Sequence, residues 1–292
     1  MTLQGLAQIL ASGLLMGLIY ALIAAGLSLI FGLMDVVNFA HGEFLMLAMY
    51  ATFGIVVATA LDPVLAAPLV VGAMFVLGAF VYFAVIRHAM RAKANIGMVQ
   101  VFATFGLGIT IRGLAQHVFT PDYRSIQTSF LAGRTLDLGG VFLPLPQLFG
   151  GLLSCLSFVA LYFIIRRTDF GRALEATRED AGAVALVGID KNRVFALGWG
   201  LGAALVGIAG SVMAIFYYIH PDVGTPFALI AYVTVALGGF GSIFGALAAG
   251  LLVGIVEAIS ATILSPSMKA VGIYLMYLVV VFMRPRGLFG NL

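Results

Sequence analysis

Residues 9–33 read ILASGLLMGLIYALIAAGLSLIFGL, a stretch without a single charged side chain. An α-helix rises about 1.5 Å per residue, so about 20 such residues cross the roughly 30 Å hydrocarbon core of a membrane. Similar apolar segments follow at 43–61, 64–86, 97–119, 147–165, 194–218, 227–264 and 268–283. The pattern predicts an all-α polytopic membrane protein in which residues 1–292 form one transmembrane domain.

The composition excludes several classes of protein. Of the 292 residues, 62% are hydrophobic and only 9% are charged, whereas about a quarter of a soluble domain is charged. So few charges cannot cover a water-exposed surface, and they exclude both a disordered chain and a nucleic-acid-binding protein. The single cysteine, Cys155, excludes an intrachain disulfide and a multi-cysteine metal site.

The basic residues predict the orientation, because Lys and Arg are retained on the cytoplasmic side of a membrane. Eleven of the fifteen lie in the segments 87–95, 166–193 and 284–286. This distribution places the N-terminus outside and the C-terminus in the cytoplasm. The region 227–264 must then cross twice, with a break near 238–242. Its first piece, near 227–239, indicates a short discontinuous or re-entrant segment, so we expect eight or nine transmembrane helices.

The sequence lacks the motifs of the common catalytic sites. It contains no His-Glu-x-x-His pair, no Gly-x-Ser-x-Gly elbow and no Gly-Lys-Ser/Thr phosphate loop. We therefore expect no enzyme, no catalytic residue, no metal site and no ATP-hydrolysing site in this chain.

The most charged part of the chain is the 27-residue loop 167–193, which holds ten of the 27 charged residues. Thr177, with an acidic residue three positions later, predicts the start of a short helix. Small apolar residues follow at helical spacing up to Gly188, which is placed to end that helix. So short a helix needs a surface to dock on, either this protein's own membrane domain or a separate cytoplasmic partner. The alternative is a solvated loop.

Two charged residues, Arg112 and Glu257, lie well inside expected spans. Counted along their helices, both are about 21–22 Å from the cytoplasmic edge. Charges inside a membrane tend to pair, so we expect a buried ion pair between them. The alternative is that one of the two contacts the substrate.

Polar residues also gather between the first two spans, on the expected cytoplasmic side. By position, Asn38, His41 and Glu43 there form a polar turn that caps two helices. We expect His41 to be hydrogen-bonded rather than a metal ligand, since no second ligand accompanies it.

Several motifs, taken in order, resemble those of branched-chain amino acid ABC transporter permeases, and specifically the H-type subunit. They extend over essentially the whole chain: Gly17-Leu-Ile-Tyr20, Val37-Asn-Phe-Ala-His-Gly-Glu43, Gly171-Arg-Ala-Leu-Glu-Ala176, Gly188-Ile189-Asp190, Gly238-Gly239-x-Gly241-Ser242 and Arg284-Pro-Arg-Gly287.

The resemblance implies one subunit of an importer in the bacterial inner membrane. A second permease would complete the path, two cytoplasmic ATPases would use ATP to drive it, and a periplasmic binding protein would deliver leucine, isoleucine or valine. This chain itself would bind no cofactor. The loop 167–193 corresponds to the family's coupling loop, and we expect ATPase docking at Glu179, Asp180, Ala185 and Gly188. The resemblance also includes Asn38, His41 and Glu43, and it implies a gating or inter-subunit role for them as the alternative to a polar turn.

Two other classes of function stay open at this stage. One is a self-sufficient secondary transporter or channel, for which Glu257 would be the coupling carboxylate; the other is an intramembrane enzyme. The path would also suit other amino acids, urea or short amides.

Overall fold

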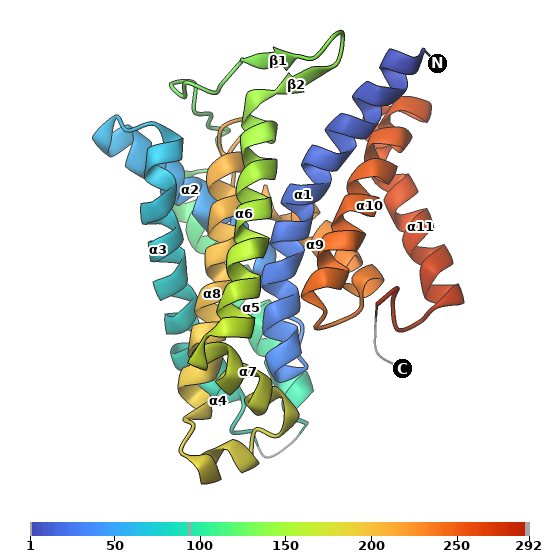
Figure 1. Cartoon of the computed structure of the whole chain (residues 1–292). Helices are drawn as coiled ribbons and strands as arrows, with labels where there is room; N and C mark the ends of the chain where they lie inside the picture. The colour runs from blue at the N-terminus through green and yellow to red at the C-terminus, as the bar shows by residue number, and fades with distance from the viewer. Residues whose placement is uncertain (1, 93–94, 290–292) are drawn as a thin grey trace.

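The computed structural model describes residues 2–92 and 95–289, and it is built almost entirely of helices (Figure 1). The helices are α1 (Leu3–Met34), α2 (His41–Thr59), α3 (Pro63–Val81), α4 (Arg87–Ala89), α5 (Ile96–Phe119), α6 (Leu145–Arg167), α7 (Asp169–Glu179), α8 (Lys191–Met213), α9 (Gly224–Gly238), α10 (Ile243–Ile263) and α11 (Lys269–Met283). A π-helical turn, Tyr82–Ile86, joins α3 to α4, and 3₁₀ turns lie at Ala183–Val187 and Pro266–Met268. The strands β1 (Thr135–Asp137) and β2 (Phe142–Pro144) pair in an antiparallel hairpin.

The long helices lie side by side and give the bundle two ends (Figure 1). We call the end with β1, β2 and the start of α1 the hairpin end, and the opposite end, with α7, the α7 end. Among the described residues, eight helices are long and apolar enough to cross a membrane. The ninth apolar helix, α9, has 15 residues. The expected all-α polytopic fold, with a short segment near 227–239, is confirmed.

The break in the region 227–264 also lies where the sequence predicts it. Gly239 and Gly241 have φ values of 93° and 78° and turn the chain between α9 and α10. Ten of the 15 residues of α9 are buried, and the helix packs on α1, α2 and α10. Its neighbours therefore shield most of this short helix from lipid, as a re-entrant segment requires.

One span ends earlier than the hydropathy predicts. Helix α8 stops at Met213 rather than near residue 218. Beyond it, Arg124 and Ile219 exchange both of their backbone hydrogen bonds, at 2.9 and 2.8 Å. This bridge draws the chain out of the helix and ties the connection 120–144 to the connection 214–223.

Helix α1 lies at the centre of the core and packs on α6, α8, α9 and α10. Its contact with α10 is made of glycines at both helices: a β-carbon on Gly254 would lie 2.2 Å from the carbonyl oxygen of Gly13. Small residues allow helices to approach this closely in a membrane, where dispersion contacts replace the hydrophobic effect as the source of stability.

Candidate functional site

Helix α2 begins inside the bundle. The ring of His41, its first residue, lies with Nε2 2.8 Å from the carbonyl oxygen of Ile23 in α1. Ile23 precedes the end of α1 at Met34 by 11 residues, which is about 16 Å along the helix. The chain between α1 and α2 therefore turns back into the bundle. The expected cytoplasmic position of Asn38, His41 and Glu43 is wrong, because all three are buried in the interior.

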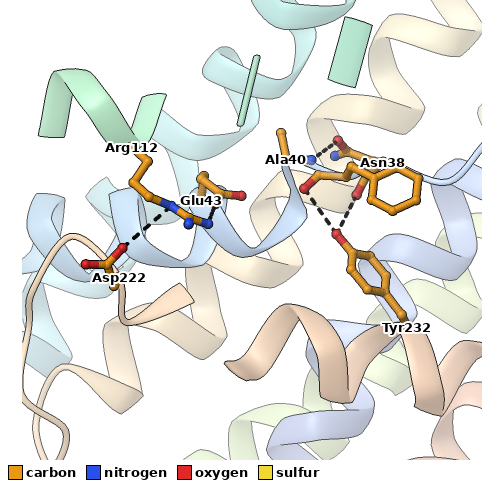
Figure 2. Close-up of polar contacts among 7 residues, drawn as sticks. Asn38, Ala40, Glu43, Arg112, Asp222 and Tyr232 are labelled. Atoms are coloured by element: carbon orange, nitrogen blue, oxygen red, sulfur yellow. Dashed lines mark hydrogen bonds and ion pairs between the residues drawn. The ribbon is translucent and has the colours of Figure 1, made fainter. Parts of the chain in front are cut away.

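Hydrogen bonds from two neighbouring helices hold this returning segment in place. The hydroxyl of Tyr232, in α9, donates to the carbonyl oxygen of Phe39 at 3.1 Å (Figure 2). The Phe39 N–H donates to Thr104 Oγ1 of α5 at 3.2 Å. The side chain of Asn38 accepts from the Ala40 N–H at 3.0 Å. Irregular backbone at membrane depth requires such partners, since no water is available to replace them.

A network of three charges lies beside this segment and joins three parts of the chain (Figure 2). Glu43 in the first turn of α2 forms an ion pair with Arg112 of α5. The Nε of Arg112 lies 3.8 Å from Oδ1 of Asp222, just before α9. The side chain of Glu43 is 6% exposed, that of Arg112 35% and that of Asp222 58%. The network therefore leads from the buried core to the open face of α5.

Two helix N-termini meet next to these charges. A β-carbon on Gly224, the first residue of α9, would lie 2.0 Å from the carbonyl oxygen of Gly42 in α2, so only glycine fits here. Each N-terminus carries about half a positive charge from the helix dipole. The net charge here is about zero, because one guanidinium and these two half-charges offset the two carboxylates. The arrangement explains why two acidic residues are tolerated so close together.

The expected ion pair between Arg112 and Glu257 is not formed. Glu257 of α10 pairs instead with Lys269, the first residue of α11, at 2.6 Å. Equal depth in the membrane does not make two helices neighbours: α5 packs on α2, whereas α10 packs on α1, α9 and α11. Sequence reasoning placed Glu43 on the cytoplasmic side and did not single out Lys269, so it missed both actual partners. It also missed Asp222.

The charged loop 167–193 contains a helix, but not where the sequence predicts its start. Thr177 lies inside α7, buried, and its hydroxyl donates to the Ala173 carbonyl at 2.6 Å. The helix starts earlier because Thr168 caps it, accepting from the Gly171 N–H at 3.2 Å. Helix α7 packs on α1, α6 and α8. It therefore docks on this protein's own membrane domain.

The segment after α7 forms a separate exposed turn, which we call the coupling turn, residues 180–188. Asp180 Oδ1 accepts from the N–H groups of Gly182 and Ala183, at 2.7 and 2.9 Å. Gly188, with φ of 81°, ends the 3₁₀ turn Ala183–Val187, whereas the predicted continuous helix from Thr177 to Gly188 is not formed. All four expected docking residues are exposed: Glu179, Asp180, Ala185 and Gly188.

Two apolar side chains of the coupling turn also face solvent. Leu186 is 89% exposed and Val187 is 74% exposed. Sequence reasoning treated the small residues of this turn as its apolar face and did not single these two out. In the ranges 2–92 and 95–289, no group of three His, Cys, Asp or Glu side chains is arranged to hold a metal ion.

Comparison with known proteins identifies the family. The model of the permease component of branched-chain amino acid transport systems matches residues 9–282. The chain belongs to this family. The resemblance found in the sequence motifs is thereby confirmed.

Individual relatives match the permease over nearly all of its length. It is 31% identical over 295 residues to the high-affinity branched-chain amino acid transport system permease protein BraD of Pseudomonas aeruginosa, covering 97% of this chain and 95% of the relative. It is also 31% identical over 296 residues to LivH of Escherichia coli, with the same coverage. The E. coli permease protein LivM is 34% identical over 143 residues, 47% of this chain and 33% of the relative. No solved structure matches the permease.

Proposed function

We propose that this permease is one of two transmembrane subunits of an ATP-driven importer and that the pair carries leucine, isoleucine or valine. Its family, and its similarity to LivH and BraD over nearly the whole chain, support this assignment. The similarity to LivM supports a related permease as the second subunit.

The observation that carries the ATPase coupling is the exposure of Leu186 and Val187 on the coupling turn. Two large apolar side chains that project into water favour contact with a soluble protein. The carboxylates of Glu179 and Asp180 lie exposed at the same turn and would orient that protein. The chain has no phosphate-binding loop of its own. ATP hydrolysis is therefore assigned to two cytoplasmic ATPases that bind this turn.

The charge distribution supports an orientation with the α7 end in the cytoplasm. Basic residues gather at the α7 end, whereas the connection 120–144 at the hairpin end holds only two, Arg124 and Arg134. The N-terminus then lies outside the bacterial inner membrane, and a periplasmic binding protein delivers the amino acid to the hairpin end.

The partly exposed charges on α5 support the position of the second permease. Arg112 and Asp222 lie on a face of the bundle that this chain leaves open. Charges inside a membrane face protein or a water-filled path rather than lipid. We assign this face to the boundary between the two permeases, where the translocation path runs.

Co-purification tests the assignment directly. The permease, tagged and expressed with its partner permease, should bring down two ATPases. Reconstituted with the binding protein, the complex should take up L-leucine only when ATP is supplied. The double variant Leu186→Ser, Val187→Ser should lose the ATPases while the two permeases stay together.

A matched control comes from the hairpin end. Leu138 is also exposed, at 59%, but it lies at the other end of the bundle, so Leu138→Ser should keep the ATPases bound. Retention of the ATPases by the double variant would contradict the assigned docking turn. Uptake of leucine by this chain alone, without ATPases, would instead establish a self-sufficient secondary transporter.

A further inference from the structure

A cavity of about 350 Å³ opens at the hairpin end between the start of α9, the later part of α10 and the start of α11. Its walls are mainly apolar and aromatic, formed among others by Val223, Phe227, Ile230 and Tyr274. Small-molecule sites are typically concave and mostly apolar, with a few polar groups that fix the orientation of the ligand. This cavity has the required size and lining.

Beside the hydroxyls of its tyrosines and the imidazole of His220, the wall of the cavity contains one ion pair. Glu257 and Lys269 both line the cavity, with Lys269 Nζ 2.6 Å from Glu257 Oε1. Glu257 is almost fully buried and Lys269 is 43% exposed. At this distance the ammonium and the carboxylate form an ion pair. An ammonium group that turns toward a ligand gives up this contact, so the ligand has to replace it with charges of its own.

A further polar group, the hydroxyl of Tyr20, lies beside Glu257. The hydroxyl of Tyr20 is buried and has no hydrogen-bond partner among the described residues. Glu257 and Tyr217 are its ionisable neighbours. A buried hydroxyl without a partner is costly. Its position beside Glu257 lets it donate to that carboxylate when Lys269 turns away.

We propose that this cavity is a substrate-binding site of the permease itself and that it binds a free aliphatic α-amino acid as the zwitterion. This inference rests on the proposed importer function. The ammonium group of the ligand pairs with Glu257, its carboxylate pairs with Lys269, and its side chain lies against Phe227 and Ile230.

The energetics favour a zwitterion over a ligand with a single charge. A zwitterion replaces one ion pair by two and leaves neither Glu257 nor Lys269 uncompensated. A ligand that lacks either charge leaves one protein charge without a partner, which is costly in a partly buried site. The cavity also adjoins the charge network in sequence: Val223 lines the cavity, and the preceding residue, Asp222, contacts Arg112 of α5.

Equilibrium binding tests this proposal. The purified complex of the two permeases and their ATPases, in lipid nanodiscs and without the binding protein, is titrated with radiolabelled L-leucine. Leucinamide, which lacks the carboxylate, and 4-methylpentanoate, which lacks the ammonium group, serve as competitors. Each should compete at least about tenfold more weakly than leucine, because each loses a hydrogen-bonded charge contact.

The variants assign each contact. Lys269→Met should weaken leucine binding at least about tenfold and abolish the preference over leucinamide. Glu257→Gln should also weaken leucine binding at least about tenfold, and it should abolish the preference for leucine over 4-methylpentanoate. Arg134→Met removes another basic residue at the hairpin end, outside the cavity. It should change neither the affinity for leucine nor the preference over either competitor. Unchanged preferences in both charge variants, or no saturable leucine binding by the unaltered complex, would overturn the proposal.

A cysteine-protection measurement covers the case in which the charge variants do not fold. Ala270 lines the cavity, and Ala270→Cys in a Cys155→Ser background keeps both charges. Leucine should slow the reaction of this cysteine with a maleimide, whereas leucinamide should not; equal rates with and without leucine would contradict the site. ATP-driven uptake measured in the same preparation separates this result from failure of the importer function.

Discussion

The carbonyl oxygen of Gly42, at the start of α2, lies against the α-carbon of Gly224, at the start of α9. The two helices thus begin at the same point inside the bundle, and a β-carbon on Gly42 would lie 2.6 Å from the Gly224 carbonyl oxygen. Glu43 and Asp222 flank this contact in sequence, and Arg112 lies between their carboxylates. The close approach of the two glycines is therefore a condition for the charge network.

The first prediction concerns this contact. Gly224→Ala places a methyl group 2.0 Å from a backbone oxygen, which cannot move aside as a side chain would. We expect a loss of about 2 kcal/mol or more in stability and a fall of about 5 °C in the melting temperature of the purified permease. Gly54→Ala, in the partner helix α2 but in open space, is the control and should be neutral or slightly stabilising. Equal melting temperatures for the two variants would refute the contact.

The second prediction concerns the network itself. Glu43→Gln or Arg112→Met alone leaves a charge without its partner, at a cost of about 3 kcal/mol or more. The double variant removes both charges and should recover part of this loss. Asp222→Asn should cost about 1 kcal/mol or less, because Asp222 is exposed and more distant.

A double-mutant cycle on melting temperatures provides the measurement. A double variant whose loss equals the sum of the two single losses would show that Glu43 and Arg112 do not interact.

The third prediction concerns the end of the coupling turn. Gly188 has φ of 81°, and a β-branched residue there is strained by about 1–2 kcal/mol. Gly188→Val should distort the turn, leave the membrane domain folded and abolish substrate-stimulated ATPase activity. Gly188→Asn should retain most of that activity, because Asn tolerates a left-handed backbone. Unchanged uptake by Gly188→Val would count against ATPase docking at this turn.

The fourth prediction concerns the start of the same turn. The N–H groups of Ala183 and Gly182 donate to Asp180 and hold the pKa of its carboxyl below its ordinary value. A lowered pKa in the folded state means that the stabilisation is complete above the ordinary carboxyl value, about 4, and is lost as the pH falls through the lowered pKa. The turn should thus be equally ordered at pH 5 and pH 8.

Hydrogen exchange measures this order. Asp180→Ala should speed exchange at the amides of Gly182 and Ala183 at both pH values, whereas Asp180→Asn, which keeps an accepting oxygen, should have a smaller effect. Faster exchange in the unaltered protein at pH 5 than the intrinsic pH dependence allows would contradict the lowered pKa.

Hydropathy and charge counting predicted most of the fold, because each span must be long and apolar and basic residues collect on one side. They even located the break at Gly239 and Gly241, since the basic C-terminal end requires two crossings of 227–264. They failed at residues 35–40. A polar connection between two spans is typical of a surface loop, and its return into the core depends on Tyr232 and Thr104, which lie far away in sequence.

The candidate site was harder to predict for a related reason. Residue counting gives the depth of a side chain in the membrane but not the direction in which its helix faces. Residue counting gave Arg112 and Glu257 the same depth. Arg112 nevertheless pairs with Glu43 of α2, and Glu257 pairs with Lys269 of α11. Only the arrangement of the helices decides such pairs.

The bridge between Arg124 and Ile219 has a mechanical consequence. Because these residues share two backbone hydrogen bonds, the two connections at the hairpin end move as one ribbon. Tyr123 and Tyr218, the residues next to the bridge on either strand, both line the cavity that contains Glu257 and Lys269. A displacement of the connection 120–144 is therefore transmitted through these two hydrogen bonds to both sides of the aromatic wall of that cavity.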